Sequence, residues 1–192
     1  MAAGNIGAGL RQLAGRRHAR TLAVAATGTA AAAAVIGLAI PAGASPVAAR
    51  PAAITGTEHF QSVTASVTSN TAPVIAWGPF AAGGTDHMSN SNAPTSTDLF
   101  TFPGGSSFKV THTSKAMSQS DNAKTCFLEF TDKGTYKLSG GTGKYKGISG
   151  HGTFTVTGIG IAARTKKGAC NPNANPVAFQ EIISASGPVR LP

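Results

Sequence analysis

Acidic residues, cysteines and large aromatic side chains are all scarce in this chain of 192 residues. It has 7 Asp and Glu against 16 Lys and Arg, with 2 cysteines, 2 tyrosines and 1 tryptophan. No CxxC or HxxxH spacing occurs, so the sequence predicts no metal site. No GxSxG elbow or Ser-His-Asp order is present, and GGSSF at 104–108 does not supply one, so hydrolase chemistry has no support. No cofactor is expected.

In residues 45–192 the basic residues are scattered, and only Lys166 and Lys167 are adjacent. An arginine-rich face interleaved with aromatic residues is missing, which argues against a nucleic-acid partner.

The chain also lacks the i, i+3, i+4 pattern of amphipathic helices beyond its first quarter. Short alternating runs rich in Thr, Val, Phe and Ser recur instead, separated by glycine and proline. The pattern predicts an all-β domain, an antiparallel sandwich or barrel. We expect a single barrel, because closure removes the edges that such strands otherwise expose. The expected strands are 57–68, 73–80, 97–102, 106–113, 125–131, 134–139, 151–163 and 177–186, with polar loops at 83–96 and 166–176.

Residues 1–44 have the order of a secretory signal, basic, then apolar, then small. Arginines begin the segment, residues 22–40 carry no charge, and Ala42-Gly43-Ala44 suits a signal peptidase. The alternatives are a membrane anchor and, from Arg16-Arg17, twin-arginine export. We expect cleavage, no stable membrane anchor afterwards, and a secreted, extracellular protein with a flexible leader at 45–56 and a barrel domain at 57–192. Four of the 16 basic residues leave with the signal, so 12 remain against 7 acidic residues, a net charge of +5.

The two cysteines, Cys126 and Cys170, both lie in the predicted barrel domain. Outside the cytoplasm an even pair usually forms a disulfide. The sequence therefore predicts a structural bridge between them.

Residues 138–158, LSGGTGKYKGISGHGTFTVTG, combine glycines with lysines as phosphate-binding loops do. A Walker A loop requires GxxxxGK[ST], but Tyr145 follows Lys144, and Leu138 occupies the position of the first glycine. Lys146 occupies the third glycine position of a dinucleotide-binding fingerprint. Both flanks are strand-like, whereas both motifs must open a helix. The glycines are therefore expected to serve turns and bulges.

The same run resembles a family signature. Gly140-Gly141-Thr142-Gly143-Lys144-Tyr145-Lys146-Gly147, then Gly150 and Gly152, is similar to the GGTGxYxGxxGxG pattern of the allene oxide cyclase and dirigent barrel superfamily. FTFPGGSSFKVTHT at 100–113, Cys126 and GTYKLSGG at 134–141 resemble bacterial secreted proteins with that domain. The resemblance covers residues 57–186 and implies an eight-stranded antiparallel barrel with an apolar cavity. Members of the superfamily are often dimers or trimers, so the resemblance also implies a homo-oligomer as a possible partner state. No acidic catalytic motif of those enzymes aligns here, so catalysis stays open.

Alternation along the predicted strands offers three candidate lumen residues, Glu129, Glu181 and His112. Glu181 interrupts an apolar face, Glu129 shares a face with Phe127, and His112 shares one with Phe108. A carboxyl group in a lumen would have a raised pKa and act as a general acid or base, and a histidine would act as a proton shuttle. The alternatives are outward-facing or lysine-paired carboxylates and a core histidine bonded to a backbone carbonyl.

The sequence thus predicts a barrel that binds a small apolar or aromatic ligand in its lumen. One alternative is a cofactor-independent enzyme, cyclase- or isomerase-like. The other is a non-catalytic surface-interaction protein whose lumen is filled by side chains. An open cavity on the order of a few hundred Å3 would favour a ligand, and facing polar groups within it would favour the enzyme.

Overall fold

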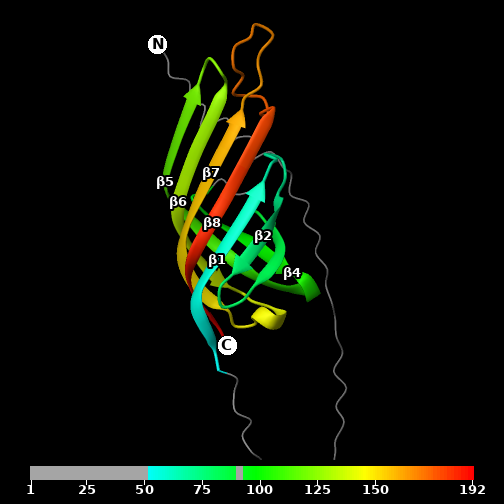
Figure 1. The fold of residues 1–192 in the computed structure, drawn as a ribbon, viewed down its shortest axis with the longest axis vertical. Coiled ribbons are helices and arrows are strands. Elements are labelled where there is room, and N and C mark those ends of the chain that lie inside the picture. Colours follow the sequence, from blue (N-terminus) through cyan, green and yellow to red (C-terminus); the bar gives the residue numbers. More distant parts are fainter. Residues whose placement is uncertain (1–51, 90–92) are drawn as a thin grey trace, which may run out of the picture. The chain divides into compact units, whose positions relative to one another are not determined.

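The computed structural model describes residues 52–89 and 93–192. Eight antiparallel strands form one sheet in chain order, and the sheet closes into a barrel (Figure 1). The predicted all-β barrel is confirmed. In these two ranges no helix has the length and apolar character needed to cross a bilayer. The predicted signal at 1–44 and residues 45–51 of the predicted leader lie outside the described residues.

The strands follow one another along the chain, with two 3-10 turns, η1 and η2, between them. They are β1 (Ile54–Thr64), β2 (Thr71–Trp77), β3 (Ala82–His87), β4 (Thr95–Phe102), η1 (Pro103–Gly105), β5 (Ser106–Asn122), β6 (Phe127–Ser139), η2 (Gly143–Tyr145), β7 (Ser149–Ile161) and β8 (Ala178–Leu191).

The strand count agrees with the prediction because two errors cancel. β3 lies inside the expected loop 83–96, and β6 is one strand where two were expected. The first error came from the polar composition of residues 83–96, and in both places a glycine serves close packing between strands. A Cβ on Gly84 would meet the Thr101 carbonyl oxygen, and one on Gly134 would meet the Thr113 carbonyl oxygen and the Phe154 ring.

The barrel closes between its first and last strands. β1 pairs with β8 over the whole length of β1, from Ile54 opposite Leu191 to Thr64 opposite Glu181. Residues 54–56 therefore belong to the sheet and not to the flexible leader expected at 45–56.

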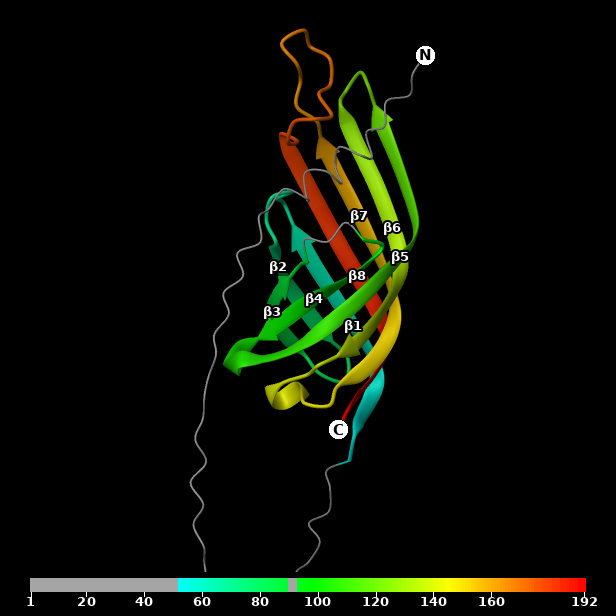
Figure 2. The ribbon, with the colours of Figure 1, turned by 180° about the vertical axis from the view of Figure 1, so that it is seen from behind.

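Four strands continue past the barrel rim. β4 pairs with β5 only as far as Thr95 opposite Thr113, yet β5 and β6 stay paired out to Asn122 opposite Phe127. β5, β6, β7 and β8 therefore extend beyond the short strands β2 to β4, as Figures 1 and 2 show. We call this part the extension.

A disulfide ties the two hairpins of the extension. Cys126 in the β5–β6 turn is bonded to Cys170 in the β7–β8 connection, 44 residues later, which confirms the predicted bridge. The Arg164 guanidinium supports the same junction, since it donates hydrogen bonds to the Lys124 and Gly168 carbonyl oxygens at 2.6 Å each. The bridge therefore stabilises the end of the molecule opposite η2.

The glycine-rich run predicted as a turn closes the other end of the barrel. Tyr145 in η2 is 1% exposed, and its ring centroid lies 5.0 Å from those of Phe80 and Phe102 and 5.2 Å from that of Phe108. These rings belong to one buried cluster that fills this part of the lumen. The turn therefore places the Tyr145 side chain in the end of the lumen. The segments on either side of the turn are strands β6 and β7, as expected.

Loss of the disulfide should destabilise the protein. The double variant Cys126→Ala/Cys170→Ala frees a closed loop of 44 residues in the unfolded chain, which amounts to about 4 kcal/mol in the chain-entropy model. Urea denaturation of both proteins measures the difference. A thiol count on unfolded, unreduced protein is the control, and two free thiols would refute the bridge.

Gly143→Val should destabilise by about 1–3 kcal/mol, because Gly143 has a φ of +54° and an added Cβ would collide with Ser106 Oγ. Gly83→Val is the matched control, since a Cβ there meets nothing within 4 Å. Thermal melts compare the two. Equal melting temperatures for both variants would contradict the role assigned to the turn.

Candidate functional site

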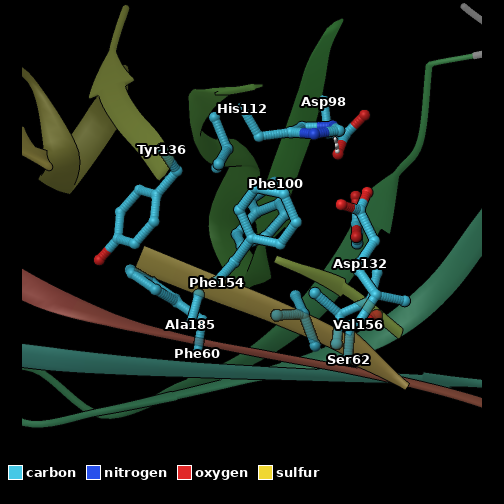
Figure 3. A pocket seen from close by; sticks show the side chains of 14 residues that line it. Phe60, Ser62, Asp98, Phe100, His112, Asp132, Tyr136, Phe154, Val156 and Ala185 are labelled. Atoms are coloured by element: carbon cyan, nitrogen blue, oxygen red, sulfur yellow. Dashed lines mark ion pairs between the residues drawn. The ribbon is translucent and has the colours of Figure 1, made fainter. Parts of the chain in front are cut away.

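A cavity of about 90 Å3 lies in the lumen, on the side of the extension. Its walls come from all eight strands and are mixed, with apolar side chains beside carboxyl groups and one histidine (Figure 3). The lining residues are Phe60, Ser62, Val74, Asp86, Asp98, Phe100, Val110, His112, Asp132, Tyr136, Phe154, Val156, Ile183 and Ala185.

Asp98 on β4 and His112 on β5 form an ion pair at one side of the cavity. His112 Nε2 lies 3.0 Å from Asp98 Oδ2 and 2.9 Å from Ser96 Oγ, so a proton on Nε2 is shared between the two oxygens. The Ser89 N–H donates to Asp98 Oδ1 at 2.7 Å. The hydrogen bond that His112 donates to Asp98 raises the pKa of His112, and the charges of Asp98, Asp86 and Asp132 also raise it, whereas burial lowers it. His112 therefore holds its proton more firmly than an exposed histidine.

Asp86 on β3 is the most deeply buried carboxyl group in the cavity wall, with an exposed fraction of 2%. No protein group donates a hydrogen bond to its Oδ1. Burial raises the pKa of Asp86 to about 8, repulsion by Asp98 and Glu181 adds to this, and attraction by His112 opposes it. Asp86 is therefore protonated at neutral pH in the free barrel.

Two further acidic side chains stand near the rim. Asp132 on β6 lines the cavity, and its Oδ1 accepts a hydrogen bond of 2.6 Å from the Ser114 hydroxyl. Glu181 on β8 lies on the same face as Ile183 and Ala185, which line the cavity. Burial raises the pKa of Glu181. The rim thus carries acidic side chains on both β6 and β8.

Most acidic side chains face the inside of the barrel, and the described basic side chains of Lys and Arg lie on its outside. Five of the chain's seven acidic residues face the lumen, namely Glu58, Asp86, Asp98, Asp132 and Glu181. All eleven Lys and Arg residues of the described chain are exposed, and none lines the cavity. The lumen is therefore an acidic compartment in a basic protein.

Glu58 belongs to the aromatic end of the lumen and not to the cavity wall. Its side chain is fully buried, and its Oε2 accepts a hydrogen bond of 3.2 Å from the Phe80 N–H. Burial raises the pKa of Glu58 to about 7, which this hydrogen bond partly opposes.

The three predicted candidates have different positions. His112 lines the cavity, and Glu181 lies on the inner face of β8 beside it. Glu129 is exposed on β6, because the alternation there buries Leu128 and turns Glu129 outward, so the expectation of a lumen position was wrong.

Asp86, Asp98 and Asp132 were not identified from the sequence as lumen residues. Asp98 shares the parity of Phe100 and Phe102 in an expected strand, so the alternation that selected Glu181 would have found it. Asp86 fell in an expected loop, and Asp132 fell between two expected strands, so no face was assigned to either.

No group of three His, Cys, Asp or Glu side chains able to hold a metal ion is found in residues 52–89 and 93–192. No protein-family model, curated protein or solved structure matches this chain.

The raised pKa of Asp86 predicts an unusual dependence of stability on pH. Between the unfolded pKa of 3.8 and the folded pKa of about 8, the unfolded chain loses the proton and the folded chain keeps it. Stability should therefore fall as the pH rises through this window, by at most about 1.4 kcal/mol per pH unit from one carboxyl group. Asp86→Asn cannot lose this proton, so its stability relative to the wild type should increase from pH 4 to pH 8.

Urea denaturation at pH 4, 6 and 8 measures this difference. Glu129→Gln, which removes an exposed carboxylate, is the matched control and should show no such trend. A constant difference between Asp86→Asn and the wild type at all three pH values would contradict the assignment.

Proposed function

We propose that the barrel binds a small molecule in its lumen, through an apolar body and at least one hydrogen-bond donor. One observation carries this proposal. Two buried polar atoms in the cavity wall, Asp86 Oδ1 and Ser62 Oγ, have no hydrogen-bond partner in the protein. Leaving a buried polar group unpaired costs about 1–3 kcal/mol. A ligand that donates to these oxygens would recover that free energy and be oriented by it.

The remaining walls suit an apolar or aromatic body. Phe60, Phe100 and Phe154 contribute rings, and Val156 and Ile183 contribute aliphatic surface. Figure 3 shows Asp98, His112 and Asp132 gathered on one side, with Tyr136 on the other. A ligand with one polar end and one apolar end matches this division.

The size of the cavity limits the enclosed part of the ligand. Its volume is about 90 Å3. It is smaller than the few hundred Å3 that were expected for a ligand site, because the aromatic cluster fills the other end of the lumen. The enclosed group therefore has only a few non-hydrogen atoms. The part of a larger ligand that does not fit in the cavity would extend outward past His112, whose side chain is 32% exposed.

The setting of this binding is also a proposal. A disulfide is typical of oxidising compartments, and the bond between Cys126 and Cys170 supports an extracellular protein released by its 1–44 signal. The closed eight-stranded barrel and the turn at Gly140–Gly147 support kinship with the allene oxide cyclase and dirigent barrel superfamily.

A second candidate function is a cofactor-independent isomerase or cyclase. It is favoured by the neighbouring polar groups of the cavity wall, since Asp86 keeps a proton at neutral pH on the strand next to that of Asp98, which pairs with His112. Groups whose environments displace their pKa values are suited to donate and accept protons. Recovery of the bound molecule unchanged after incubation would favour a binding protein, and conversion to an isomer would favour the enzyme.

Filling the cavity should abolish binding. In Ala185→Phe the new ring occupies the lumen, and Ala185→Leu is a milder filling should the first variant fold poorly. Methyl NMR of Val156 and Ile183 during titration with 1-butanol and benzyl alcohol reports binding. We expect shifts in the wild type that saturate, and reduced or absent shifts in both variants.

Ala178→Phe is the matched control, because Ala178 is exposed on the same strand and its variant should bind as the wild type does. Wild-type protein without saturable shifts for either compound, or undiminished binding by both cavity-filling variants, would overturn the proposal.

A further inference from the structure

We propose that the molecule bound in the lumen is an organic cation, a protonated primary or secondary amine whose N–H groups donate to Asp86. This inference rests on the proposed function and names the chemical class of its ligand. It follows from the distribution of charge, from the unpaired oxygen of Asp86 and from the aromatic walls.

The charge of the cavity wall selects the sign of the ligand. Asp86, Asp98 and Asp132 line it, Glu181 stands beside it, and His112 is the one basic side chain among the lining residues. His112 is already engaged with Asp98 at 3.0 Å, so it does not neutralise the other carboxyl groups. Above the pKa of Asp86 an anion would face three acidic groups in a setting of low dielectric, where repulsion is strong. A cation would instead balance them.

Asp86 Oδ1 gives the ligand its hydrogen-bonding character. It is a buried acceptor without a protein donor, and it belongs to a residue that is 2% exposed and lines the cavity. A quaternary ammonium group would supply charge without a donor, whereas a primary or secondary ammonium supplies both. Hydrogen bonds to an ionised partner are also about twice as strong as neutral ones.

The aromatic walls favour the same class. Rings of Phe60, Phe100, Phe154 and Tyr136 line the cavity, and the face of an aromatic ring attracts a cation. The enclosed volume of about 90 Å3 accommodates an ammonium group and a short carbon chain. The rings therefore add to the attraction that the acidic groups exert on a cation.

Ammonium binding should strengthen as the pH rises from 6 to 9. Asp86 must lose its proton to form the ion pair, and with a pKa of about 8 it does so within this range. Below that pKa each unit of pH weakens binding about tenfold. Deprotonation of His112, whose pKa is raised, removes a competing cation and acts in the same direction. Asp98, Asp132 and Glu181 also face the site, and their negative charge adds to the attraction.

The test compares three compounds with the same four-carbon chain, n-butylammonium, 1-butanol and butyrate. Methyl NMR of Val156 and Ile183 in the full-length protein gives each Kd at pH 6, 8 and 9. At pH 9 we expect n-butylammonium to bind at least tenfold more tightly than 1-butanol and butyrate to bind most weakly. Between pH 6 and 9 the Kd of n-butylammonium should fall at least tenfold, while that of 1-butanol should stay within threefold.

Asp86→Asn should bring the Kd of n-butylammonium to within threefold of that of 1-butanol, because the amide keeps the shape and loses the charge. Glu129→Gln removes a carboxylate from the outer surface and should keep the full preference. Equal or tighter binding of 1-butanol to the wild type would overturn this inference and leave the proposed function standing. A preference that survives in Asp86→Asn would also overturn it. If none of the three compounds shifts the methyl signals of Val156 and Ile183, both proposals are overturned.

Discussion

The pairing of β1 with β8 is the contact on which the other features depend, because it converts a sheet into a closed interior. The pairing runs from Ile54 opposite Leu191 to Thr64 opposite Glu181. Once the ring is closed, every second side chain of each strand is withdrawn from water. Aromatic rings gain free energy from this withdrawal, while carboxyl groups lose their hydration. The same closure therefore packs Phe108 and displaces the pKa of Asp86.

The two ends of the lumen differ in what occupies them. At one end η2 inserts Tyr145 among phenylalanine rings and leaves no space for a ligand. At the other end acidic, aliphatic and aromatic residues line a cavity, and the disulfide between Cys126 and Cys170 ties the strands that extend beyond it. A filled end gives the barrel a rigid base, and the acidic end concentrates the groups with displaced pKa values. Such a division is typical of a scaffold that carries a site.

The all-β class, the disulfide and the turn at residues 140–147 could be predicted from the sequence, because alternation, cysteine parity and glycine spacing are local signals. The strand boundaries could not. Gly84 and Gly134 look like turn residues, and only the approach of strands distant in sequence shows that they permit close packing. Those errors concealed Asp86 and Asp132. His112 and Glu181 could be selected because their strands alternate regularly, whereas the pairing of His112 with Asp98 depends on the register of β4 against β5.

The protonation of Asp86 is the most direct measure of this account, since it reports both burial and the missing hydrogen-bond donor. Aspartate labelled with 13C at the carboxyl carbon would give one NMR titration curve for each side chain, and Asp86→Asn would identify the signal by its loss. The account predicts a midpoint at a pH of about 8 for Asp86. A midpoint near the ordinary value of 3.8 would contradict it, because the carboxyl group would then be hydrated or already paired.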